Sequence, residues 1–169
     1  MADNSMVTLM AADHIEIQAT LQAVKQCATL GTMLEVLDEQ QTLGLPIPVL
    51  EVSGEALKKV IEWCEYHRED MVVETEQPGV AAQILTSLPQ WDTEFFANIG
   101  DKDLLIKICN ASNFLEIPLL LQYSIFVIAQ ALRGKSTEEM RAFLNIENDL
   151  TPEEEQKIRE DNAWAMPQN

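Results

Sequence analysis

The hydrophobic pattern of the chain begins with short strand-like runs and then takes on helical periods. Apolar runs at residues 7–10 and 15–17, separated by a turn at residues 12–14, predict two strands near the start. Residues 21–37 have a helical character that is interrupted near Gly31. The pattern therefore places the strands early and predicts a chain made mainly of helices.

The clearest helix of the first half follows a third predicted strand at residues 48–52. It begins at Ser53, a residue type that caps helices, and carries Glu55 in its first turn, where a negative charge is favourable. Its apolar residues have the i, i+3, i+4, i+7 spacing of one buried face: Leu57, Val60, Ile61 and Cys64. We expect this helix to pack against the core.

The middle of the chain predicts a long loop followed by two helices. Residues 68–90 have no clean period and contain Pro78, Gly79 and Pro89, so we expect a loop there. A short helix begins near Trp91, and Asp101 caps another. The inward-facing residues of this second helix are expected to be Leu104, Leu105, Ile108 and Cys109.

Residues 117–132 contain no charged residue and need to be weighed against a membrane span. The run is shorter than the ~20 residues that cross a bilayer, begins with a proline and carries Gln122, Ser124 and Gln130. A buried helix is the better prediction. It should end near Arg133 and Gly134, since glycine commonly ends helices.

The last residues predict two charged helices, each beginning with a capping box, in which a side-chain hydroxyl and a carboxylate each accept an N–H at the helix start. Ser136 pairs with Glu139 in the first, and Thr151 pairs with Glu154 in the second. Favourable four-residue charge pairs are expected from Glu153 to Lys157 and from Glu155 to Arg159, each contributing about 0.2–0.5 kcal/mol.

The second charged helix has almost no apolar face. Ile158 is nearly its only apolar residue, with Trp164 just beyond and Ile146 and Leu150 just before. Most helix stability in proteins comes from a packed apolar face, so this helix has too little to anchor itself in a core. Two interpretations remain open, a frayed and solvated tail or an element that packs when a partner docks on it.

Composition bounds the class of the protein. A chain of 169 residues with 47% hydrophobic residues suits one domain plus an extension. The net charge of −17 excludes a binder that tracks nucleic-acid phosphates, and it also argues against adhesion to anionic membranes. Charged partners should therefore present basic faces.

The cysteines and the first residues indicate a reducing compartment. Cys27, Cys64 and Cys109 are an odd number and widely spaced, which favours reduced and mostly buried thiols. Residues 1–10 have neither a basic region nor a sustained apolar stretch, so we expect no secretory signal. The expected location is the cytoplasm and the nucleus.

Catalytic chemistry is hard to find in this sequence. His14 and His67 are far apart, and each is better explained as a surface or packing residue than as a base or a metal ligand. Residues 134–136 resemble the end of a phosphate-binding loop but lack its other glycine and its preceding strand. We expect no catalytic residue, no metal and no cofactor, and interpret the chain as a binding protein.

Several motifs of the chain resemble those of the Skp1 family. The longest is residues 57–70, which are similar to the family's LKKVIxWCxxHxxD signature. Residues 89–95 resemble PxWDxEF, and residues 113–117 resemble NYLDI. Residues 32–35 match TMLE, residues 134–141 resemble GKTPEEIR, and residues 145–164 resemble the terminal NIKNDFTxEEE…NxW pattern. The resemblance keeps this order from about residue 7 to residue 164.

The resemblance implies a helix-dominated α/β fold, with a BTB/POZ-type domain over residues 1–133 and a two-helix extension over residues 134–169. Members of the family are non-catalytic adaptors of SCF-type ubiquitin ligases, in which the POZ part docks on a cullin and the C-terminal helices hold the F-box of a substrate receptor. The cullin contact maps onto Asn113 and Phe114. The F-box contacts map onto Ile146, Asn148, Leu150, Ile158 and Trp164.

The sequence departs from the family pattern at several positions. Residues 11–15 stand where the family has SSDGE, so a glycine is lost and the first hairpin is expected to be altered. Phe114 replaces a tyrosine and lacks its hydroxyl. A second hypothesis is a structural assembly subunit that binds F-box-like partners without a cullin. A third is a single-POZ adaptor of the elongin C type, against which the capped extension argues.

Overall fold

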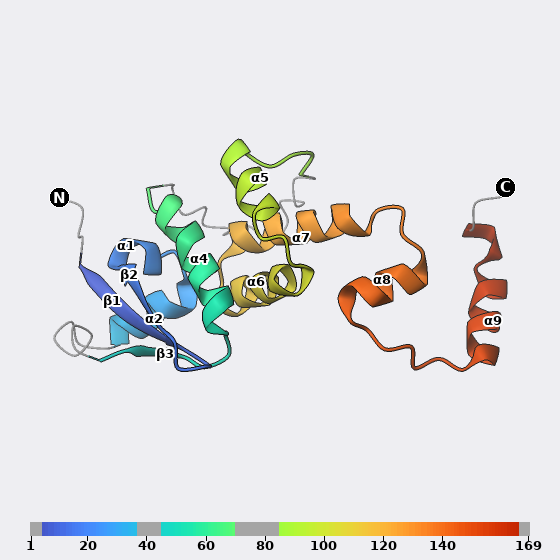
Figure 1. Ribbon diagram of the computed structural model, residues 1–169, viewed down its shortest axis with the longest axis horizontal. Helices are drawn as coiled ribbons and strands as arrows, with labels where there is room; N and C mark the ends of the chain where they lie inside the picture. Colours follow the sequence, from blue (N-terminus) through green and yellow to red (C-terminus); the bar gives the residue numbers. More distant parts are fainter. Residues whose placement is uncertain (1–4, 37–44, 70–84, 166–169) are drawn as a thin grey trace. The chain divides into compact units, whose positions relative to one another are not determined.

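The structure is a computed structural model that describes residues 5–36, 45–69 and 85–165. The chain divides into two compact units, Met1–Arg133 and Gly134–Asn169, and each is described by itself. Figure 1 shows the elements of both units, coloured along the sequence.

The first unit contains a three-stranded sheet. β1 (Met6–Ala11) pairs with β2 (Glu16–Thr20) in antiparallel orientation and with β3 (Ile47–Val49) in parallel, so the strand order is β2-β1-β3. The runs predicted as strands at residues 7–10, 15–17 and 48–52 correspond to β1, β2 and β3. The hairpin between β1 and β2 forms with His14 in the left-handed conformation, at a φ of 62°. That this hairpin is altered relative to the family stays a prediction.

Two helices follow β2, and the interruption between them is not at Gly31. α1 covers Leu21–Val24 and α2 covers Ala28–Val36, so Gly31 lies inside α2. The break falls at residues 25–27, where the Gln26 side-chain amide donates to the carbonyl oxygen of Cys64 over 3.2 Å. A contact with a distant element thus lies at this break, and the local sequence pattern does not indicate it.

α4 (Gly54–Tyr66) forms the centre of the first unit. Leu57, Val60, Ile61 and Cys64 are all buried, which confirms the predicted face. The helix begins at the predicted residue, but Ser53 makes no side-chain cap; the carboxylate of Asp13 accepts from the Gly54 N–H instead, at 3.0 and 3.1 Å. The hairpin turn thus supplies the cap that the sequence assigned to Ser53.

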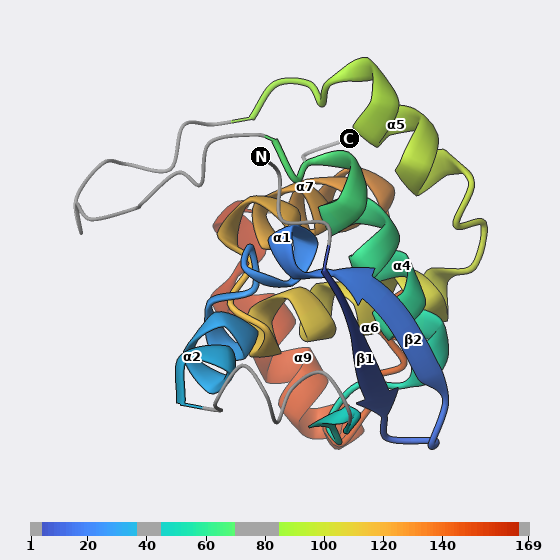
Figure 2. The same cartoon turned by 90° about the vertical axis from the view of Figure 1, so that its left-hand side faces the viewer.

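The remaining helices of the first unit are α5 (Gln90–Ala97), α6 (Lys102–Phe114) and α7 (Pro118–Leu132). α4 packs against the sheet on one side and α6 on the other, and α6 packs against α7 (Figures 1 and 2). Asp101 caps α6 as predicted, accepting from the Asp103 N–H. Residues 70–84 of the predicted loop lie outside the described residues.

α7 is less buried than predicted. Leu120, Tyr123 and Ser124 are buried on its first half, whereas residues 125–132 include no buried residue and Ile125 is 52% exposed. The second half still contacts the core through Val127 and Ile128, which are half-buried, so burial decreases along the helix. In the described ranges no helix is both long and apolar enough to cross a membrane.

A buried aromatic and polar cluster joins α4 to α5. Asp92 accepts a 2.7 Å hydrogen bond from the Trp63 indole N–H, and His67 Nε2 lies 3.2 Å from the same oxygen. The His67 ring also stacks on Trp63, with ring centroids 4.0 Å apart. His67 is thus a packing residue, one of the two roles expected for it.

Among the described residues, the buried hydrophobic core lies in the first unit. Its buried hydrophobic residues run from Val7 to Tyr123, and they include Cys27 and Cys64. The prediction of mostly buried thiols is confirmed for these two, while Cys109 is half-buried. A hydrogen bond with Cys27, together with burial, raises the pKa of the Cys64 thiol.

Candidate partner-binding surfaces

The second unit begins where Gly134, with φ of 78°, ends α7. α8 (Thr137–Leu144) starts with the predicted capping box: Ser136 Oγ accepts from the Glu139 N–H at 3.2 Å, and Glu139 accepts from the Ser136 N–H at 2.7 Å. The helix ends at Asn145, whose positive φ of 56° turns the chain away. Local sequence alone therefore sets both ends of α8.

α9 (Pro152–Asp161) starts with the second predicted capping box. Thr151 Oγ1 accepts from the Glu154 N–H at 3.3 Å, and the Glu154 carboxylate accepts from the Thr151 N–H at 2.8 Å and from its hydroxyl at 2.9 Å. These bonds, first the one from the backbone and then the one from the hydroxyl, lower the pKa of Glu154. A short 3-10 helix, η1 (Ala163–Ala165), follows.

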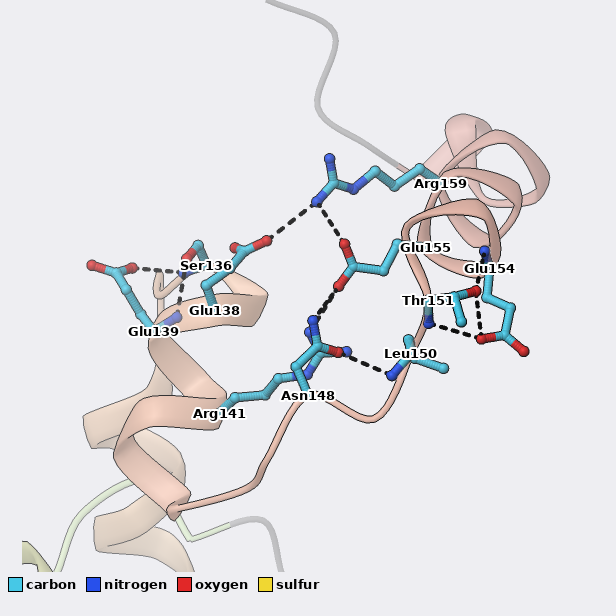
Figure 3. A network of polar contacts seen from close by, with 10 residues as sticks. All are labelled: Ser136, Glu138, Glu139, Arg141, Asn148, Leu150, Thr151, Glu154, Glu155 and Arg159. Carbon is cyan, nitrogen blue, oxygen red and sulfur yellow. Dashed lines mark hydrogen bonds and ion pairs between the residues drawn. The ribbon is translucent and has the colours of Figure 1, made fainter.

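A network centred on Glu155 connects the two helices (Figure 3). One oxygen of its carboxylate lies 3.3 Å from the Arg141 guanidinium on α8 and accepts a 2.7 Å hydrogen bond from the Asn148 amide. The other lies 3.9 Å from Arg159, which also pairs with Glu138 at 3.3 Å. One carboxylate therefore links α8, the segment between the helices and α9.

Sequence reasoning found only part of this network. The four-residue spacing predicts the Glu155–Arg159 pair, and the pair is present. No ion pair joins Glu153 to Lys157 in the described part of the chain. The Arg141 and Asn148 contacts span fourteen and seven residues, and no helical periodicity signals contacts of that kind.

The five residues expected to contact an F-box lie in three parts of this unit. Ile146, Asn148 and Leu150 lie between α8 and α9, Ile158 lies on α9, and Trp164 lies in η1. Ile146, Ile158 and Trp164 are 55%, 47% and 84% exposed, and Leu150 is half-buried. Among the described residues of this unit none is buried. The described apolar side chains of this unit are therefore exposed to solvent or half-buried, and no described residue of the unit is fully buried.

The two residues expected to contact a cullin lie in the first unit, at the end of α6. Asn113 and Phe114 are both exposed, Phe114 by 40%. The backbone around them is held tightly: Thr29 Oγ1 donates to the Phe114 carbonyl at 3.1 Å, and the Ile117 N–H donates to Ser112 at 2.9 Å. The fold presents this aromatic ring on a fixed turn.

A hollow of about 360 Å³ opens beside Phe114, and no sequence pattern indicates it. It is lined by Glu51, Val52, Ser53, Ala56, Lys107, Asn110, Ala111 and Phe114. These residues come from two separate stretches that meet only in the folded unit. The buried hydroxyl oxygen of Ser53 has no hydrogen-bond partner there.

The chemistry of the described residues suits binding. His67 and Asp92 form a close acid–base pair, but their side chains are only 8% and 1% exposed and pack against Trp63, so a substrate has no access. The described residues contain no group of three or more His, Cys, Asp or Glu side chains that could hold a metal ion. Both units expose apolar side chains: Phe114 at the end of α6 in the first, and residues beside the capped helices α8 and α9 in the second.

Two family models match the chain. Residues 5–69 match the Skp1 family, tetramerisation domain, and residues 118–165 match the Skp1 family, dimerisation domain. The chain belongs to the Skp1 family. The predicted resemblance is therefore confirmed, as is the helix-dominated α/β fold with its small early sheet.

Relatives match over almost the whole length. The chain is 37% identical over 162 residues to Suppressor of kinetochore protein 1 of Schizosaccharomyces pombe, covering 95% of this chain and 98% of the relative. It is 37% identical over 159 residues to E3 ubiquitin ligase complex SCF subunit sconC of Arthroderma benhamiae, covering 94% of each chain. The same-named protein of Aspergillus clavatus is 36% identical over 162 residues, covering 96% of this chain and 98% of its own.

Proposed function

We propose that this protein is the adaptor subunit of an SCF-type E3 ubiquitin ligase, and that it joins a cullin scaffold to F-box substrate receptors. The observation that carries the proposal is full-length similarity, since relatives named as SCF subunits align over nearly all of both chains. In this role the protein is not an enzyme; it brings two partners together in ubiquitin-dependent protein degradation.

The proposed F-box surface is the extension. A Trp side chain buries about 150–250 Å² when enclosed, yet Trp164 is 84% exposed and α9 offers it no core. Exposed apolar residues on a preformed scaffold are the usual centre of a protein interface. We assign F-box contact to Ile146, Asn148, Leu150, Ile158 and Trp164.

The proposed cullin surface is the turn that carries Asn113 and Phe114. The ring of Phe114 is 40% exposed beside the 360 Å³ hollow, and its backbone is held by the bond from Thr29. A fixed aromatic next to a hollow suits a contact in which side chains of the two partners interdigitate. Because the chain carries a net charge of −17, basic faces on either partner would favour association.

A second function has its own support. One relative is named Suppressor of kinetochore protein 1, a name that points to an assembly other than a ligase. The chain could therefore act as a structural subunit that binds F-box-like partners without a cullin. Cullin binding separates the two functions, and a location in the cytoplasm and the nucleus suits both.

The test is affinity purification of the full chain, with F-box proteins and cullins identified among the co-purifying proteins. It is repeated with a chain that ends at Arg133, which keeps the whole hydrophobic core. We expect the full chain to recover both classes of partner and the shortened chain to lose F-box proteins while keeping the cullin.

The shortened chain needs a check of its fold, and a single cooperative thermal transition provides it. F-box proteins recovered by a folded chain without residues 134–169 would overturn the assignment of the F-box surface. Recovery of F-box proteins without any cullin by the full chain would favour the assembly subunit.

A further inference from the structure

The carboxylate of Glu155 contacts residues of α8, of the segment between the two helices and of α9. It reaches Arg141 on α8 at 3.3 Å, Asn148 in the connecting segment at 2.7 Å and Arg159 on α9 at 3.9 Å (Figure 3). Arg159 closes the ring by pairing with Glu138 on α8 at 3.3 Å. We call Glu138, Arg141, Asn148, Glu155 and Arg159 the polar clamp.

The clamp matters because the extension has little apolar packing of its own. None of its described residues is buried, so hydrophobic packing contributes little to fixing α8 against α9. The side chains of Arg141 and Glu155 are only 22% and 26% exposed, whereas those of Arg159 and Glu138 are 59% and 64% exposed. Partly buried charges are screened less than exposed ones, which makes Arg141–Glu155 the strongest pair of the clamp.

We propose that Glu155 is a positioning residue, whose contacts with Arg141 and Asn148 hold α8 and α9 in the arrangement that presents Ile146, Leu150 and Ile158 to an F-box. This inference rests on the proposed function and adds to it the group that pre-organises the binding surface. A polar clamp leaves the apolar residues uncovered for the partner, whereas a hydrophobic contact between the helices would bury them.

Asn148 belongs to the clamp. Its amide N–H donates to Glu155, and its amide oxygen accepts from the Leu150 N–H at 3.3 Å, so both ends of the side chain are engaged within the extension. These bonds fix the backbone immediately before Thr151, where the capping box of α9 begins. Besides the F-box contact assigned to it above, Asn148 thus holds Leu150 and the start of α9 in place.

The effect on affinity follows from population arithmetic. A partner that binds one arrangement has its apparent affinity reduced by the fraction of molecules in that arrangement. Loss of one partly buried charged contact shifts a conformational equilibrium in a protein by about five- to tenfold. When the clamp is broken, we therefore expect the fraction of molecules in the binding arrangement to fall several-fold. The affinity for an F-box domain should fall by the same factor.

The test is a double-mutant cycle in the full chain with Glu155→Gln, Arg141→Gln and the combination, using a recombinant F-box domain from a protein that co-purifies with the chain. We expect each single change to weaken binding about five- to tenfold, and the double change to weaken it no more than the larger single effect. Arg141→Lys, which keeps the charge, should restore most of the affinity.

The matched control is Glu153→Gln, an equal change of charge on the same helix outside the clamp. We expect its affinity to stay within twofold of wild type. Additive effects of Glu155→Gln and Arg141→Gln would indicate that each side chain contacts the F-box directly and would overturn the inference. An equal loss in Glu153→Gln would do the same, because it would indicate a general effect of charge.

A measurement on the free protein keeps the inference independent of the proposed function. In hydrogen exchange of the full chain, Glu155→Gln and Asn148→Asp should speed exchange of the α9 amides several-fold, while Glu153→Gln should not. Asn148→Asp is included because it places a second carboxylate beside Glu155.

The two measurements separate the inference from the proposed function. If wild type binds no F-box domain, the proposed function is wrong. If Glu155→Gln and Asn148→Asp leave the exchange rates of the α9 amides unchanged, the positioning role of Glu155 is wrong.

Discussion

Individual residues of this protein take positions that other residue types would occupy at lower energetic cost. His14 has a φ of 62° in the turn between β1 and β2, where a left-handed backbone closes the hairpin. Its N–H donates to Ala11, and the Ala11 N–H donates to Ile15, each at 3.0 Å. The turn therefore keeps the geometry that a glycine would adopt freely, at the expense of backbone strain at a residue with a Cβ atom.

Replacing His14 with glycine should stabilise the protein. Removal of the Cβ atom relieves the left-handed strain, while the greater freedom of glycine in the unfolded chain offsets part of the gain, so we expect a rise of about 0.5–1 kcal/mol in the free energy of unfolding. Urea denaturation measures it. His14→Ala, which keeps the Cβ atom, should give no comparable gain; if it does, loss of the imidazole ring explains the effect.

Polar side chains connect two pairs of helices in this protein, α4 with α5 and α8 with α9. In the first unit, Asp92 on α5 is completely buried and accepts from Trp63 on α4, with His67 beside it. In the second unit, the polar clamp joins α8 to α9 without any buried residue. The two joints use similar groups at different depths, so their loss should have different consequences.

Asp92→Leu should destabilise the first unit strongly. The change leaves the buried Trp63 N–H without its acceptor, and an unsatisfied buried polar group costs about 1–3 kcal/mol. We expect a loss of at least 2 kcal/mol in the free energy of unfolding, measured by urea denaturation. Asp92→Asn keeps an oxygen near the indole N–H and should lose less. Equal losses in the two variants would show that the hydrogen bond is not the cause.

The capping box of α9 should make its first turn sensitive to acid. The pKa of Glu154 is lowered by the Thr151 N–H and hydroxyl, so the folded helix favours the ionised carboxylate. Its contribution is complete above the usual glutamate value of 4.5 and is lost as the pH falls through the lower folded value. The side-chain carbon shift of Glu154, followed by NMR, should titrate below that value. In Thr151→Ala the midpoint should rise; an unchanged midpoint would contradict the capping role.

At the scale of the whole molecule, the two units differ in what stabilises them. In the part of the chain that the structure describes, the first contains the buried hydrophobic residues, and the second is a set of capped helices with exposed apolar residues. Each unit carries one of the two surfaces of the proposed adaptor. Damage to one surface should therefore leave the other partner bound.

The combined variant Asn113→Ala and Phe114→Ala should lose cullin binding and keep F-box binding. Truncating an aromatic at the centre of an interface costs about 2–4 kcal/mol, enough to weaken binding well over tenfold. Met6→Ala, which removes an exposed apolar side chain from β1, is the control and should bind normally. Phe114→Tyr restores the hydroxyl of the family and should bind a cullin at least as well as wild type. Equal cullin binding by wild type and the double variant would place the interface elsewhere.

The sequence by itself determined the features that depend on neighbouring residues. The buried face of α4 follows from its period, and the ends of α8 and the start of α9 follow from Ser136, Asn145 and Thr151, because these bonds span three to five residues. Family motifs then supplied the fold and the candidate surfaces, since the matching residues occur in the same order as in the family.

Only the tertiary structure decided the features that depend on residues far apart in the chain. The break between α1 and α2, the cap of α4 by Asp13 and the hollow beside Phe114 all join segments separated by tens of residues. The polar clamp spans a shorter distance but crosses from one helix to another. A sequence pattern records the period of one element, and contacts between elements depend on how the chain brings them together in space.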